Sequence, residues 1–133
     1  MRKVFVSAPL NAPTQDMIEE NIRFAEKCGN VVRAFDMYPI IPHQLARFLD
    51  DNNQEERAIG VQLSLNKMKE CDYLIAYQQR VTAGMLQEIV ECGKLGIPVL
   101  YFDDLDDLID VLYSICDDLE DDEYKGRPCE GSR

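Results

Sequence analysis

Residues 71–88, CDYLIAYQQRVTAGMLQE, decide the fold of this chain. Their first half is an apolar run, 73–77, with polar residues on both sides, which is typical of a central strand in a parallel sheet. In the second half, Thr82 is placed to cap a helix, and Gly84 and Glu88 share one face of it. Ligands bind beyond the strand ends of such sheets, so this face is a candidate site. An ordinary strand-to-helix junction with a solvated Glu88 would give the same spacing, and both interpretations stay open.

Three more apolar runs, and the helical patterns between them, predict the rest of the sheet. The further strands fall at residues 4–6, 38–41 and 99–102. Strands separated by helices imply right-handed crossovers and parallel pairing. We therefore expect an α/β fold: a doubly wound parallel sheet, flavodoxin- or Rossmann-like, of four to five strands in the order 2-1-3-4, with helices on both faces.

The sequence predicts three further features of the helices. The helix after the first strand could stop at Gly29 or continue to Phe35. The helix over 54–70 has Ile59 and Leu63 at helical spacing, so these side chains are expected on its apolar face. After the fourth strand, an apolar stripe with helical period predicts a last amphipathic helix.

Composition indicates one domain, residues 1–120, followed by an acidic tail, 121–133, that we expect to be disordered. Eleven acids and no Lys or Arg lie within 103–123, whereas 1–102 holds thirteen acids and eleven bases. This distribution argues against nucleic-acid binding, which needs clustered basic residues. Neither a signal peptide nor a membrane span is recognisable. Five scattered cysteines without a CxxC pair favour the reducing cytoplasm over a disulfide framework or a zinc site.

No cofactor or metal is indicated by the residues. A site built from several histidines is excluded because His43 is the only histidine. A cation bound by the carboxylates of Asp50 and Asp51 is a weak alternative.

The predicted topology brings three loops to one edge of the sheet, at 7–11, 42–43 and 78–88. The amides of 83–85 at the start of a helix make an anion site, suited to a phosphate or a carboxylate. Glu88, one turn further in, could reach an electrophilic carbon held above that anion. A polar insert, 44–56, is long for a plain connection, which favours a functional role. The candidate ligand-binding residues are Ser7, Pro9, Asn11, His43, Asp50, Asp51, Arg57, Arg80, Thr82, Ala83, Gly84 and Met85.

Some of these residues also have a plainer interpretation. His43 could cap a turn instead of touching a ligand. Arg57 could be the ion-pair partner of Glu56 or Asp51 instead of a phosphate ligand. Asp72, a second catalytic candidate, has the pattern of an orienting or capping group.

The surroundings expected for Glu88 bear on its charge. A crevice walled by Phe5, Tyr77 and Met85 would raise the pKa of this carboxyl group by desolvation. A hydrogen bond, or a nearby cation such as Arg80, would then be needed to keep it ionised at neutral pH.

A strand followed by Thr82, Gly84 and Glu88 resembles the nucleoside 2-deoxyribosyltransferase and nucleotide N-glycosidase superfamily. Its members have Ser or Asp, Gly two residues later and a nucleophilic Glu four residues after the Gly. Asp72 falls on the superfamily's Asp at the head of that strand.

Over residues 4–102 the chain is similar to a subgroup of small, uncharacterised bacterial and phage proteins in this superfamily. The motifs that carry this similarity are SAPL at 7–10, PH at 42–43, FLDD at 48–51, ERAIG at 56–60, CD at 71–72 and TAGMLQEI at 82–89.

The resemblance implies a doubly wound fold and a reaction at an N-glycosidic bond. Glu88 would attack C1′ of a 2-deoxyribosyl group, and water or a second base would resolve the glycosyl-enzyme. Thr82 would favour a 5′-phosphorylated nucleotide over a nucleoside. Members complete their sites across a subunit interface, so a closed homo-oligomer, such as a dimer or a multiple of it, is implied.

The chain departs from the characterised enzymes at one position. These carry a second acidic residue about eight positions before the strand-head Asp, where this chain has Ser64. Asp50, Asp51 or Glu56 could replace that acid. Two functions therefore remain: an enzyme acting on a (deoxy)nucleotide, or a protein on the same scaffold that binds a nucleotide without turning it over.

Overall fold

The computed structural model describes residues 1–45, 48–50 and 52–126. Four strands, β1 (Lys3–Ser7), β2 (Tyr38–Ile40), β3 (Tyr73–Tyr77) and β4 (Val99–Phe102), form one sheet. Its order is β2-β1-β3-β4 and all its pairs are parallel. The predicted α/β class, the four strands and their order 2-1-3-4 are therefore confirmed.

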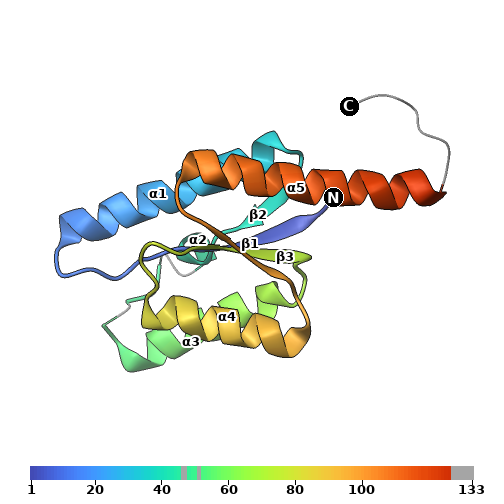
Figure 1. Ribbon diagram of the computed structural model, residues 1–133. Coiled ribbons are helices and arrows are strands. Elements are labelled where there is room, and N and C mark those ends of the chain that lie inside the picture. Colours follow the sequence, from blue (N-terminus) through green and yellow to red (C-terminus); the bar gives the residue numbers. More distant parts are fainter. Residues whose placement is uncertain (46–47, 51, 127–133) are drawn as a thin grey trace.

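Helices cover both faces of the sheet, as a doubly wound fold requires (Figure 1). On one face lie α1 (Gln15–Ala34) and α5 (Leu105–Gly126), and on the other lie α3 (Gln54–Met68) and α4 (Ala83–Leu95). A one-turn helix, α2 (Pro42–Leu45), follows β2. Because α1 follows β1 and α4 follows β3, the chain leaves two neighbouring strands toward opposite faces.

The alternation of side chains along the central strands divides the core into two clusters. Val4, Val6 and Ile75 pack with α1 and α5, whereas Phe5 and Leu74 pack toward α3 and α4. All five side chains are fully buried or nearly so. Strands buried on both faces have near-continuous apolar sequences, which is the pattern that the sequence displays.

Gly29 does not end the first helix. α1 continues to Ala34, and Gly29 is buried inside it. A Cβ at this position would lie 2.5 Å from Cδ1 of Ile41. The glycine therefore allows α1 to approach the segment after β2 closely. By contrast, Gly96 does end α4, with φ of 73°, a conformation that glycine adopts without strain.

The expected apolar face of α3 is wrong. Ile59 and Leu63 are exposed, and the buried row is Gly60, Ser64 and Met68. The helix is turned so that its two small residues lie against the core while Met68 fills the cluster around Phe5 and Leu74. Spacing alone could not show this, because the two rows differ by only one residue.

The last helix follows its predicted stripe, with Leu108, Leu112 and Ile115 buried against α1 and the sheet. α5 extends to Gly126, past residue 121, where the ordered domain was expected to end. The remainder of the predicted tail, 127–133, lies outside the described residues. Within the described part of the chain, no helix combines the length and the apolar character needed to cross a membrane.

Candidate active site

The candidate site begins at the end of β1, where a buried hydroxyl meets a buried carboxylate. Ser7 is the last residue of β1, and its side chain is fully buried. Its Oγ donates a hydrogen bond of 2.8 Å to Oε1 of Glu88, on α4. β1 and β3 are the neighbouring strands whose connections leave toward opposite faces. The Ser7–Glu88 pair therefore lies at the switch point, where doubly wound sheets bind ligands.

The surroundings of Glu88 control its charge. The carboxyl group is only partly exposed, and burial raises its pKa from the usual 4.5 to about 7, while the hydrogen bond from Ser7 lowers it. The raised pKa and the stabilising hydrogen bond were both expected. Arg80, the expected cation, instead donates from its guanidinium group to the carbonyl of Asn11, at 3.5 Å.

The expected walls of the crevice need one correction. Phe5 and Met85 are buried, and Phe5 lies on the α3 and α4 side of the sheet, as does Glu88. Tyr77 lies on the other side, where its ring packs 4.8 Å from the ring of Phe24. The reason is the alternation along β3, which directs Tyr77 to the same face as Ile75.

The loop after β1 is held by side chains from three different elements. His43 of α2 contacts the carbonyl of Ala8 at 3.3 Å through Nε2, and Asn21 of α1 donates to the carbonyl of Leu10 at 3.0 Å. Arg80 contacts the carbonyl of Asn11, as described above. These bonds satisfy carbonyl groups of an irregular segment and fix the backbone that follows Ser7.

His43 is one of the few buried polar residues and has an unsatisfied ring nitrogen. Burial lowers the pKa of this imidazole, which favours its neutral form, in which Nε2–H donates to Ala8. Nδ1 is then an acceptor, and it has no partner among the residues that the structure describes. His43 thus holds the loop, and its ligand contact remains a prediction.

The start of α4 has the geometry of a capped helix with an open approach. Oγ1 of Thr82 accepts a hydrogen bond from the amide of Met85 at 3.2 Å, so the predicted cap is confirmed. Ala83 and Gly84 are exposed in the first turn, where amide groups lack partners inside a helix. A Cβ at Gly84 would meet nothing closer than Oγ1 of Thr82, at 4.0 Å. This end of α4 is therefore accessible to an anion.

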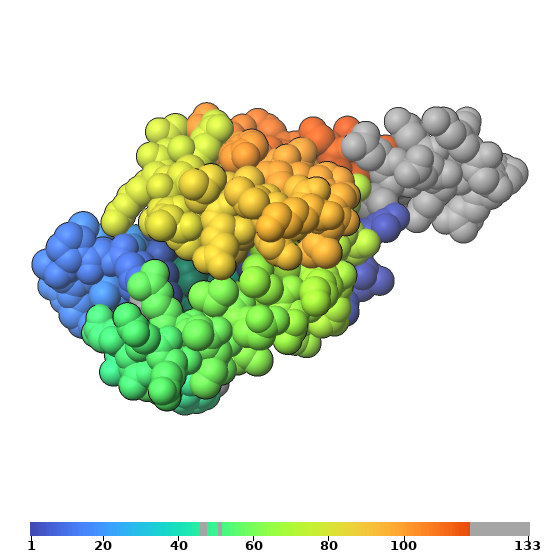
Figure 2. Space-filling view, turned by 90° about the horizontal axis from the view of Figure 1, so that it is seen from below, coloured from blue at the N-terminus to red at the C-terminus, as the bar shows by residue number. Residues whose placement is uncertain are grey.

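A space-filling view shows a hollow beside the start of α4. Figure 2 looks onto the α3 and α4 face, and the hollow lies between α3 (green), the start of α4 (yellow) and the segment after β1 (blue). The Glu88 carboxylate reaches from α4 to the end of β1. Two further hollows, of about 260 and 350 Å³, lie elsewhere and are not lined by Ser7 or Glu88.

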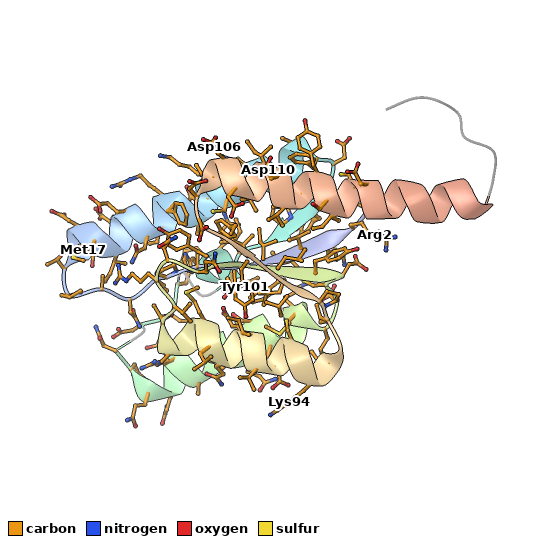
Figure 3. The ribbon with its side chains drawn as sticks, in the orientation of Figure 1. Arg2, Met17, Lys94, Tyr101, Asp106 and Asp110 are labelled. Carbon is orange, nitrogen blue, oxygen red and sulfur yellow. The ribbon has the colours of Figure 1, made fainter. Side chains whose placement is uncertain are left out.

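Asp72 does not lie at this site. It precedes β3, whose five residues separate it from the loop before α4 by roughly 16 Å at about 3.3 Å per residue. Its Oδ2 accepts from the amide of Lys3 at 2.9 Å, and Oδ1 lies 3.7 Å from Arg2. Figure 3 labels Arg2 and Met17, which mark the two opposite ends of the sheet; Asp72 is at the Arg2 end. Asp72 is the capping group that its sequence pattern indicated, and its catalytic role stays a prediction.

The insert contributes less to the site than the sequence suggested. Asp50 accepts a hydrogen bond from the amide of Asn52 at 2.9 Å, in a turn that leads into α3. Arg57 is exposed on α3 and makes no ion pair with any residue that the structure describes. Asp51 lies outside the described residues, and so does its expected contact with ligand or Arg57. Pro9, in the loop after β1, is buried like Ala8 before it.

The acids that follow β4 are occupied by local bonds. Asp103 accepts hydrogen bonds from the side-chain amides of Gln78 and Gln79, at 2.5 and 2.8 Å. Asp104 accepts from the amide of Asp107 at 2.7 Å. Throughout the described ranges, no three His, Cys, Asp or Glu side chains converge to hold a metal ion.

Two features of the site were not predicted from the sequence. Ser7 was expected to bind ligand, whereas its hydroxyl is buried and contacts Glu88. Asn21 was not singled out, although it anchors the loop through Leu10. Both depend on how a helix packs against a strand end, for which these sequence positions carry no local signal.

The fold and site define an α/β protein with a carboxylate at the switch point of a doubly wound sheet. Residues 2–102 match the family described as a domain of unknown function, DUF7768, and the chain belongs to this family. No protein with a curated function matches the sequence.

Two solved structures are similar to this chain. One is the 2-deoxyribosyltransferase of the psychrotolerant bacterium Bacillus psychrosaccharolyticus, with 20% identity and a TM-score of 0.57, over 75% of this chain and 71% of that chain. The other is the 2-deoxyribosyltransferase of Leishmania mexicana, with 17% identity and a TM-score of 0.49, over 77% of this chain and 64% of that chain. The first likeness shows that this chain shares its fold with a 2-deoxyribosyltransferase.

The raised pKa of Glu88 predicts how the Glu88→Gln variant changes stability with pH. The unfolded chain releases this proton near pH 4.5 and the folded protein near pH 7, so wild-type stability falls across this interval. The maximum loss is about 3 kcal/mol, at about 1.36 kcal/mol per pKa unit. Glu88→Gln lacks this proton, and its stability relative to wild type should therefore rise from pH 4.5 to 7.5.

Urea denaturation of both proteins at several pH values measures this difference. His43 has a lowered pKa, so its own contribution is lost as pH falls, in the opposite direction. Because both proteins contain His43, its effect cancels in the difference. A difference that stays flat from pH 4.5 to 7.5 would place the pKa of Glu88 near its ordinary value.

Proposed function

We propose that this protein is an enzyme that cleaves or transfers at the N-glycosidic bond of a (deoxy)nucleoside 5′-monophosphate, with Glu88 as its nucleophile. The observation that carries this proposal is the Ser7–Glu88 pair, which presents a carboxylate at the switch point, beside an open helix N-terminus. The likeness in fold to a 2-deoxyribosyltransferase supports the same reaction class. Thr82, Gly84 and Glu88 supply the residue types and spacing that the superfamily uses.

The proposed reaction proceeds through two displacements at C1′. A carboxylate oxygen of Glu88 attacks C1′, and the bond from C1′ to the base nitrogen breaks with its electron pair on the nitrogen. The departing base takes up a proton. Water or a second base then attacks C1′, and the ester bond to Glu88 breaks. The attacking water or base loses a proton in this step.

The phosphate would bind at the start of α4. Exposed Ala83 and Gly84 leave their amides open to an anion, and the hydroxyl of Thr82 has a proton to donate in addition to the bond that it accepts. Arg80 extends over the loop after β1 and brings a positive charge to the same edge of the sheet. These groups favour a negatively charged ligand, so we expect the site to prefer a nucleotide over an uncharged nucleoside.

Position 64 favours a second candidate function, binding of a nucleotide without turnover. Ser64 is buried on α3, where characterised enzymes of the superfamily carry their second acid. Burial and the Ser7 hydroxyl account for the pKa of Glu88, with no contribution from a second carboxylate among the described residues. Proton transfer contributes typically 10²–10⁴-fold to such reactions, so a protein lacking this acid could bind and not turn over.

The cytoplasm is the compartment that we propose for this function. The cysteines at positions 28, 71 and 92 are buried free thiols in the structure. Unpaired thiols in this number are typical of a reducing compartment.

Glu88→Gln should abolish release of base while retaining nucleotide binding. The amide has the shape of the carboxylate and can still contact Ser7, but it does not form the ester with C1′. Chromatography for free base, after incubation with a panel of nucleoside and deoxynucleoside monophosphates, measures turnover; calorimetry measures binding. Base release by Glu88→Gln at the wild-type rate would exclude the covalent mechanism. Binding by wild type without any release would select the second candidate.

Thr82→Ala should weaken binding of a nucleoside monophosphate about ten- to hundredfold and leave binding of the nucleoside almost unchanged. This follows from losing one hydrogen bond to a charged group, roughly 1.5–3 kcal/mol. Thr14→Ala is the matched control, because Thr14 caps α1 through the same contact, Oγ1 to the amide of Met17 at 3.2 Å. Equal losses for nucleotide and nucleoside in Thr82→Ala would assign Thr82 to helix capping alone.

A closed homo-oligomer, most simply a twofold dimer or a multiple of it, is also proposed. Ile59 and Leu63 on α3, and Leu86 and Val90 on α4, are about half exposed, and within each helix they are four residues apart. These two neighbouring helices thus carry apolar side chains on one surface of the molecule, which a second copy would cover.

Light scattering at micromolar concentration should give a mass that is a multiple of 15.3 kDa. Val90→Glu should lower it, because a charge would be buried between copies. Met17→Glu, a substitution of an exposed residue on α1, should leave the mass unchanged. A wild-type mass near that of one chain would contradict the proposal.

A further inference from the structure

We propose that Ser7 is a positioning residue, whose hydroxyl holds one oxygen of the Glu88 carboxylate and leaves the other free to react. This inference rests on the proposed function for its role in the reaction. Its structural part, the control of Glu88 by Ser7, stands on the geometry of the pair alone.

The first argument is the place of Ser7 in the sheet. It is the last residue of β1, after Val4, Phe5 and Val6, all of which are buried and apolar. Alternation along the strand turns Ser7 to the same side as Phe5, toward α3 and α4. A fully buried hydroxyl on this face requires a partner, and Glu88 is the partner that the structure supplies.

The second argument is the geometry of the bond. The distance from Oγ to Oε1 is 2.8 Å, within the usual range for a hydroxyl donor. Among the described residues, Ser7 is the one side chain that hydrogen-bonds the Glu88 carboxyl group. Oε1 is thus engaged, and the second carboxylate oxygen has no partner among the described residues that would have to be displaced before it attacks.

The third argument is that the donor itself is held rigidly. Pairing with Ala76 of β3 fixes the backbone of Ser7 on one side. The contacts of His43 with Ala8 and of Asn21 with Leu10 fix the loop on the other. A donor held by the sheet can orient the carboxylate without a reorganisation cost during the reaction.

Titration of Glu88 by carbon-13 NMR of glutamate-labelled protein tests the pair independently of turnover. The Glu88→Gln spectrum identifies the signal. Ser7→Ala should raise the pKa of Glu88 by about one unit, because the lost bond favours the ionised form. Ser7→Thr keeps the hydroxyl and should restore the wild-type pKa. Ser64→Ala removes another buried serine, on α3, and should leave the titration unchanged.

The pH profile of kcat/KM for base release tests the role in the reaction. Its acidic limb should move upward in Ser7→Ala by the same amount as the NMR pKa and return in Ser7→Thr. An unchanged pKa in Ser7→Ala would overturn the inference, as would a shifted pKa with an unmoved acidic limb. If wild type releases no base, the proposed function fails, whereas the NMR titration still decides whether Ser7 controls Glu88.

Discussion

The hydrogen bond from Ser7 to Glu88 is the contact on which the site depends. It joins the end of β1 to α4 through two residues that are 81 positions apart in the chain. It lies at the switch point, where the connections from β1 and β3 leave toward opposite faces of the sheet. Around it, the apolar cluster that contains Phe5 and Cys92 packs the strand against the helix. The hydrogen bond adds a contact between polar atoms of the same two elements. A carboxylate in this place costs desolvation energy, which its raised pKa reflects.

The charged and titratable groups of the site have hydrogen-bond partners and no ion pairs among the described residues. Glu88 faces a hydroxyl group, Arg80 faces a backbone carbonyl, and His43 is held neutral by burial. The four ion pairs of the described residues lie on the surface, and three of them involve Asp72 or Glu70 at the other end of the sheet. Among the described residues, the Glu88 carboxylate at the switch point has no ion-pair partner.

The fold is similar to that of a 2-deoxyribosyltransferase, and position 64 holds a buried serine on α3. The small side chain at 64 belongs to the row that packs α3 against the core.

The sequence by itself determined the sheet and most of its helices. Apolar runs such as 73–77 and 99–102 alternate with amphipathic segments. This pattern predicts a parallel sheet with helices on both faces, because buried parallel strands need to be covered on both sides. The cap at Thr82 and the stop at Gly96 were also readable, since both are local. Only the tertiary structure decided which row of α3 is buried and that Ser7 meets Glu88. The first depends on the rotation of a helix and the second on a contact between distant segments. Tertiary packing determines both, and local residue spacing does not.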